Sequence, residues 1–179
     1  MDGGRPLMSP RAKVPLIVFF VLMLHTTVFG LIHIDHVRPD ALLLLTVLAG
    51  LIGGQQAGTL VGFVAGLLAD LTLQTPFGLS ALVLTITGYS CGTLRTALVR
   101  TSWWLVPVTA LMASAGSVIA FVLLGGLVGQ SQLLRPGPVH MLTVAGLVGL
   151  MNAVLAPAIY PLVRWSFAPT KAERAYAVR

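Results

Sequence analysis

The stretch GGQQAGTLVGFVAGLLAD, residues 53–70, combines a regular series of glycines with a terminal carboxylate. The series consists of Gly54, Gly58, Gly62 and Gly66, and Asp70 ends the stretch. In water, glycine weakens a helix interior by about 1 kcal/mol relative to alanine, so four glycines in one apolar segment need a physical reason. Steps of four residues advance about 400° around a helix, which keeps neighbouring glycines on one slowly winding face.

The composition of the 179-residue chain predicts that this face lies in a lipid bilayer. Hydrophobic residues make up 56% of the chain and charged residues only 9%, whereas an ordinary soluble domain has about 25% charged residues. The net charge of +6 comes from basic residues at the ends of apolar runs. That placement is typical of membrane topology signals and not of a surface that binds nucleic acid. The single cysteine, Cys91, excludes a framework of internal disulfides.

Apolar runs separated by short polar joints predict an all-α integral membrane protein with six transmembrane helices. Residues 41–73 form an apolar run of 33 residues, which is too long for one span of a bilayer about 30 Å thick and barely enough for two. We place a break at residues 53–56, which leaves a short second helix. The expected helices are 14–34, 41–52, 57–73, 77–98, 104–128 and 139–163. They form a transmembrane domain, 14–163, between basic tails at 1–13 and 164–179.

The distribution of basic residues supports six spans with both termini in the cytoplasm, because basic residues in short loops favour the cytoplasmic side. This topology places nine basic residues inside and only two, Arg38 and Arg135, outside. The inner nine are Arg5, Arg11, Lys13, Arg95, Arg100, Arg164, Lys171, Arg174 and Arg179. One helix over residues 41–73 would instead divide the same residues seven to four, so we keep the six-helix interpretation.

The glycine series predicts a surface of close contact. In lipid, helices associate through close packing and hydrogen bonds, because hydrocarbon tails solvate leucine as well as another helix does. Two alternatives stay open: the four glycines pack against a helix of the same chain, or they dock a helix of a partner protein. Similar steps of small residues occur at Gly88 and Gly92 and at Ala145, Gly149 and Ala153.

Asp70 needs water or a polar partner, because a carboxylate at the centre of a membrane helix costs roughly 2.5–3.5 kcal/mol on insertion scales. In the six-helix topology it lies near the outer joint that contains Arg38 and Asp40. We expect these three residues to form an outer polar cluster in which Asp70 caps or cross-links the joint, with Arg38 as the candidate partner. The alternative is an interfacial carboxylate that contacts only water.

Motifs for catalysis are missing from the sequence. It has no Gly-x-Ser-x-Gly turn, no paired-carboxylate motif for magnesium and no glycine-rich phosphate loop ending in lysine, so we expect neither enzyme activity nor a cofactor. His33, Asp35 and His36 are too few ligands to predict a metal site. His25 lies in the middle of the first span, where a hydrogen bond to a carbonyl or hydroxyl group is a simpler interpretation than a proton path shared with Asp70.

Other residues carry structural expectations. Asn152 and Tyr89 are candidates for hydrogen bonds between helices. Pro107, Pro157 and Pro161 are expected to kink the helices that contain them, because proline removes a backbone hydrogen bond.

Four segments, in order, resemble the MreD family of rod shape-determining proteins. They are RPD at 38–40, GTLVGFVAGLLAD at 58–70, PFGLSAL at 76–82 and GYSCGTLR at 88–95. The segments cover about the middle third of the chain. The size, the hydropathy pattern and the basic ends are also similar to those of this family.

The resemblance implies a non-enzymatic protein of the bacterial elongation machinery in the cytoplasmic membrane, which maintains cell shape and builds lateral peptidoglycan. The implied partners are the single-span coiled-coil protein MreC and, in a larger complex, MreB filaments, the glycosyltransferase RodA and a class B penicillin-binding protein. The family is also similar in fold to the substrate-binding subunits of energy-coupling-factor vitamin transporters. That kinship implies the alternative function, a membrane subunit that binds a small solute in an outward-facing pocket.

Overall fold

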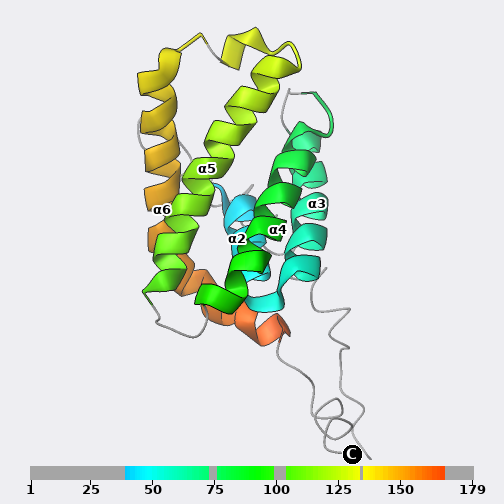
Figure 1. The fold of residues 1–179 in the computed structure, drawn as a ribbon, viewed down its shortest axis with the longest axis vertical. Coiled ribbons are helices and arrows are strands. Elements are labelled where there is room, and N and C mark those ends of the chain that lie inside the picture. The colour runs from blue at the N-terminus through cyan, green and yellow to red at the C-terminus, as the bar shows by residue number, and fades with distance from the viewer. Residues whose placement is uncertain (1–38, 73–75, 99–103, 134, 168–179) are drawn as a thin grey trace, which may run out of the picture.

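The computed structural model describes residues 39–72, 76–98, 104–133 and 135–167, most of them in helices. The helices are α2 (Ala41–Gly53), α3 (Gln55–Thr72), α4 (Leu79–Leu98), α5 (Leu105–Leu127), the short 3₁₀-helix η1 (Ser131–Leu133) and α6 (Gly137–Phe167) (Figure 1). The predicted break at residues 53–56 is confirmed, since α2 ends at Gly53 and α3 begins at Gln55. The first expected span, 14–34, the N-terminal tail and residues 168–179 lie outside the described residues, so the six-helix count stays a prediction. Residues 164–167, which we expected in the C-terminal tail, are the last residues of α6.

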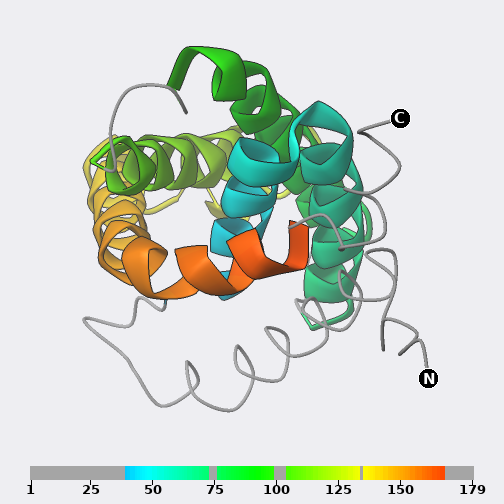
Figure 2. The ribbon, with the colours of Figure 1, turned by 90° about the horizontal axis from the view of Figure 1, so that it is seen from below.

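Helix α2 is the buried centre of the bundle. Every residue from 41 to 51 is buried, and α3, α4, α5 and α6 all pack against α2. The view along the bundle shows α2 enclosed by the other helices (Figure 2). Its 13 residues rise about 20 Å, less than the roughly 30 Å of a bilayer core. An almost entirely apolar sequence, ALLLLTVLAGLIG, is the pattern of a helix that buries all of its faces.

The outer helices form two antiparallel pairs. The pair of α3 and α4 has the most extensive contact, followed by the pair of α5 and α6. Within the described ranges, α5 and α6 are the two helices long and apolar enough to cross a membrane. The shorter α2 is apolar but falls below that length.

Helix α6 bends in its C-terminal part, where Pro157 and Pro161 lie inside the helix. Figures 1 and 2 show the last part of α6 turning across one end of the bundle instead of continuing along it. Each proline lacks the N–H that would bond the preceding turn and crowds its carbonyl, which explains the bend. Pro107 lies instead in the first turn of α5, where the missing N–H has no helical partner to lose.

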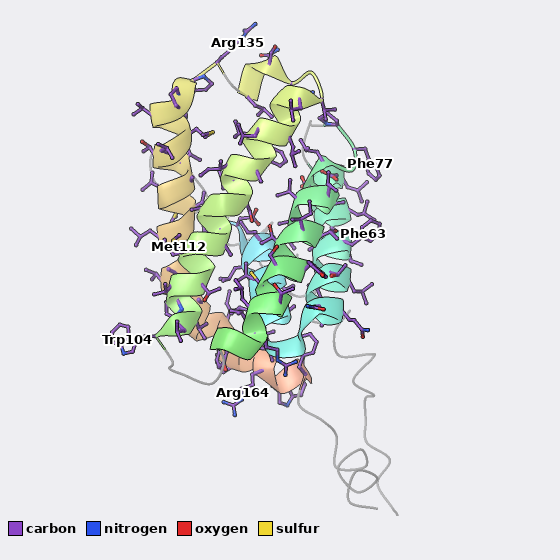
Figure 3. All side chains as sticks on the ribbon, viewed as in Figure 1. Phe63, Phe77, Trp104, Met112, Arg135 and Arg164 are labelled. Carbon is purple, nitrogen blue, oxygen red and sulfur yellow. The ribbon has the colours of Figure 1, made fainter. Side chains whose placement is uncertain are left out.

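The two ends of the bundle are marked by basic side chains. Arg135 points away from one end and Arg164 from the other (Figure 3). We refer to them as the Arg135 end and the Arg164 end.

Candidate packing site on α3 and α4

The glycine series of α3 lies directly against the backbone of α4. A Cβ atom added to Gly58 would lie 2.8 Å from the carbonyl carbon of Gly88, and one added to Gly62 would lie 2.8 Å from that of Leu84. At Gly66, the added atom would lie 2.6 Å from the amide nitrogen of Ala81. Real Cβ atoms essentially never come closer than 3.0 Å to such atoms. The two backbones can approach this closely only because these positions lack side chains.

Glycines on the neighbouring helices complete this contact. A Cβ added to Gly92 of α4 would lie 2.7 Å from the carbonyl carbon of Gly54, and one added to Gly50 of α2 would lie 2.6 Å from the carbonyl oxygen of Gly88. Gly50 therefore lies beside α4, and its Cα lies 2.8 Å from the Cβ position of Gly58. Helices α2, α3 and α4 thus meet in a single three-helix contact in which glycine comes from every member.

Gly54 has a different role from the other three glycines of the series. It follows the last residue of α2 with φ +87°, a conformation that side chains disfavour. Its amide donates to the carbonyl of Gly50 at 2.8 Å. Nη1 of Arg95 would lie 3.1 Å from a Cβ at this position. Gly54 therefore makes the tight turn that lets α3 fold back along α2.

These contacts bear on the two alternatives for the glycine face. Gly58, Gly62 and Gly66 are all buried, and the nearest atoms to their open faces belong to α2 and α4 of the same chain. In the folded chain this face is therefore occupied, and a partner helix cannot reach it without displacing α4.

Asp70 caps the start of α4 from the last turn of α3. Its Oδ2 accepts hydrogen bonds from the amides of Gly78 at 2.8 Å and Ala81 at 3.3 Å, and its Oδ1 accepts from the amide of Ser80 at 3.0 Å. The side chain is only 4% exposed. The first amides of a helix have no partner within the helix, and its N-terminus favours negative charge. The carboxylate thus joins two helices and satisfies amides that the bilayer cannot.

Asp40 is the N-cap of α2, where its Oδ1 accepts from the amide of Leu43 at 3.0 Å. Gly58 of α3 lies beside Gly50 of α2 and Gly88 of α4, and Gly62 lies beside Thr46 and Leu84 of the same two helices. Residue numbers therefore fall along α2 and α4 as they rise along α3, so α3 runs antiparallel to both and α2 and α4 run parallel. Both capped N-termini therefore point toward the same end of the bundle, the Arg135 end. The third member of the predicted outer polar cluster, Arg38, lies outside the described residues. Asp70 binds backbone amides, a set of partners that the sequence did not predict.

Hydrogen bonds between polar side chains join α5 to α6 and also link the two helix pairs. Nδ2 of Asn152 in α6 donates to Oγ of Ser114 in α5 at 2.9 Å, and the hydroxyl groups of Thr87 in α4 and Ser117 in α5 lie 2.7 Å apart. Asn152 is fully buried, and its Oδ1 accepts no hydrogen bond from the described residues. The predicted role of Asn152 between helices is confirmed. Tyr89, by contrast, is 51% exposed on the outside of α4.

Four residues that we considered for metal binding or proton transfer lie outside the described residues: His25, His33, Asp35 and His36. Within the described ranges, no group of three histidine, cysteine or acidic side chains is placed to hold a metal ion.

Comparison with protein families identifies the chain. The family model of the rod shape-determining protein MreD matches residues 11–166. The chain belongs to the MreD family. Searches of curated proteins and of solved structures gave no match. Membership of the MreD family indicates a role in rod shape determination.

The MreD-like segments of the sequence have physical roles in the fold. The segment 58–70 supplies the glycine face and the Asp70 carboxylate, and 76–82 supplies the amides that this carboxylate binds. The segment 88–95 supplies Gly88 and Gly92, which pack against α3. Three of the four segments that carry the resemblance thus build one unit, the α3–α4 pair, whereas the segment 38–40 supplies Asp40, the N-cap of α2.

The Asn152–Ser114 bond gives a measurable coupling between α5 and α6 of this MreD-family chain. Hydrogen bonds between membrane helices contribute about 0.6 kcal/mol on average and at most about 1.7 kcal/mol. We expect a double-mutant cycle of Asn152→Ala and Ser114→Ala, read as free energies of unfolding in detergent micelles, to give a coupling in this range. The matched cycle of Asn152→Ala with Ser117→Ala, whose hydroxyl bonds Thr87 instead, should give none. Equal coupling in both cycles would contradict the pairing.

Proposed function

We propose that the chain is a non-enzymatic membrane scaffold of the bacterial elongation machinery that docks an MreC-like single-span protein. The observation that carries this proposal is the MreD family match over residues 11–166. The packing and capping contacts of the α3–α4 pair are consistent with it, because they build a closely packed helical body whose described outer faces carry exposed apolar side chains. Such a body suits a protein whose task is to hold other membrane proteins.

In this proposal the chain lies in the cytoplasmic membrane with six spans and both termini in the cytoplasm. It supports cell shape and lateral peptidoglycan synthesis in a complex that also contains RodA, a class B penicillin-binding protein and, directly or through MreC, MreB filaments. The distribution of basic residues supports this orientation, since nine of eleven fall on one side of the predicted topology.

The partner helix must use the outside of the bundle, because the glycine face is occupied. Exposed apolar side chains cover two candidate surfaces. The first is the outer face of the α3–α4 pair, with Leu60, Phe63, Leu82 and Ile86. The second is the outer face of the α5–α6 pair, with Met112, Leu123, Leu150 and Val154. Figure 3 shows Phe63 and Met112 pointing outward on opposite sides of the bundle.

Photo-crosslinking in native membranes tests this proposal. A photoreactive amino acid would replace Phe63 or Met112 in turn, with buried Val61 of α3 as the matched control. We expect a crosslink to a coiled-coil single-span protein from Phe63 or Met112 and none from Val61. We also expect the same protein to co-purify with the natural chain when no crosslink is made. We also expect cells depleted of the chain to lose their rod shape.

Two outcomes would overturn the proposal. One is recovery of a transporter ATPase module in place of the coiled-coil protein, which is the result that the vitamin-transporter alternative predicts. The other is the absence of any protein crosslink from both outer faces while the cells keep their rod shape on depletion.

A further inference from the structure

The C-terminal part of α6 forms an arm across the Arg164 end of the bundle. We define this arm as residues 158–167, which follow Pro157. Its buried positions are Ile159, Val163 and Ser166, spaced four and three residues apart, so they form one face of a helix. The ring of Phe167 closes over the end of α2, where its Cε1 would lie 2.8 Å from a Cβ on Gly53. The arm therefore packs on the bundle through one buried face.

The opposite face of the arm is exposed and carries a cation and an aromatic ring. Arg164 is exposed and points away from the bundle (Figure 3), and Trp165 is 54% exposed. Trp104, 63% exposed, lies at the same end. Tryptophan gathers at the boundary between lipid and water, where its ring meets both. A helix with this pattern that lies across the end of a membrane bundle is oriented in the plane of that boundary.

The charges at this end are positive. Arg95, in the last turn of α4, is exposed beside Gly54, and Arg164 lies on the arm. In sequence, three basic residues, Lys171, Arg174 and Arg179, and one acidic residue, Glu173, follow the arm. Within the described ranges the acidic residues are Asp40 and Asp70, and both cap helices that begin at the Arg135 end.

We propose that the arm binds the anionic phospholipid headgroups of the leaflet that it faces, with Arg164 holding the phosphate and Trp165 lying at the headgroup level. A guanidinium group suits this role, because its planar set of N–H donors binds two oxygens of one phosphate. Attraction of one basic residue to an anionic membrane surface raises the equilibrium constant for binding to that surface about fivefold. The arm thereby couples the scaffold to the lipid composition around it. This proposal does not depend on the identity of the protein partner.

Quenching of tryptophan fluorescence tests this proposal in the full-length chain. Substitution of Trp103→Phe and Trp104→Phe leaves Trp165 as the reporter, and the protein is reconstituted in mixed vesicles of phosphatidylglycerol and phosphatidylcholine. A spin label near the headgroup is placed on one lipid or on the other at equal mole fraction. We expect labelled phosphatidylglycerol to quench Trp165 more strongly, with a preference that weakens in high salt.

Charge variants assign the preference to Arg164. We expect Arg164→Gln to lower the preference for phosphatidylglycerol about fivefold, and Arg164→Lys to keep most of it. The matched control is Arg135→Gln, because Arg135 is exposed at the opposite end and its loss should change nothing. Equal quenching by the two lipids, quenching by neither, or the same loss in Arg135→Gln as in Arg164→Gln would overturn the proposal. Helix content measured by circular dichroism confirms that each variant is folded.

Discussion

Substitution of Gly62 by leucine is expected to separate α3 from α4 and to lower the free energy of unfolding by about 1–3 kcal/mol or more. Already the first carbon of the new side chain would lie 2.8 Å from the carbonyl carbon of Leu84 and 3.0 Å from Cγ2 of Thr46. Backbone atoms cannot rotate away as a side chain can, so the helices must move apart. The measurement is denaturant-induced unfolding in detergent micelles, followed by circular dichroism.

The matched control for Gly62→Leu is Gly146→Leu. Gly146 is also a helix-interior glycine, but it is exposed and a Cβ added there meets no atom within 4 Å. We expect this variant to unfold at the same denaturant concentration as the natural chain or a higher one. If Gly62→Leu instead folded normally and lost only its protein partner, the face would be a docking surface and the internal contact would be refuted.

The second large effect is expected for Asp70→Asn, which should lower the free energy of unfolding by about 1–2 kcal/mol. Both carboxylate oxygens accept from amides at the start of α4. Asparagine keeps one acceptor, but its NH₂ group would face an N–H donor. Water is scarce around a side chain that is 4% exposed, so the lost hydrogen bonds are not fully replaced. Asp70→Ala should cost more than Asp70→Asn, because it removes both acceptors.

Asp40→Asn is the matched control for Asp70→Asn. Asp40 accepts one hydrogen bond, from Leu43, through a single oxygen, and asparagine caps helices about as well as aspartate does. We expect Asp40→Asn to change the unfolding free energy by only a few tenths of a kcal/mol. Equal losses in the two asparagine variants would contradict the three-amide cap and would indicate that charge alone matters at this end.

Much of the helix arrangement in the described ranges could be predicted from length and glycine placement. An apolar run of 33 residues exceeds one bilayer span, and GGQQ is its one run of four consecutive glycine or polar residues, so the break follows from the sequence. The structure adds the reason for glycine at position 54, which is its φ of +87°. The expected helix starts differ by a few residues, as at Gln55 instead of Ala57, because a tight turn lets the next helix begin at once.

The partner of the glycine face could not be predicted from spacing. A row of glycines has the same pattern whether its neighbour is in the same chain or in another protein. A useful signal was present in the second row, Gly88 and Gly92, which has the same spacing and packs against the first. Two complementary rows in neighbouring spans favour an internal contact over a docking surface.

The partners of Asp70 were missed because backbone amides have no sequence signature. Opposite charge made Arg38 the predicted partner of Asp70. In the structure the carboxylate instead binds the amides of Gly78, Ser80 and Ala81. The available signal was positional. An aspartate in the last turn of one helix, followed by a short joint and a new helix start at Leu79, can cap the helix that follows.

The most direct test of the internal glycine contact compares Gly62→Ala with Gly146→Ala by their free energies of unfolding in the same micelles. Both changes add one methyl group within a helix, and both gain the same helix propensity, about 0.5–1 kcal/mol. We expect opposite signs: Gly146→Ala should stabilise the chain by up to about 1 kcal/mol, and Gly62→Ala should destabilise it. Stabilisation of similar size in both variants would show that α4 does not pack on the glycines of α3.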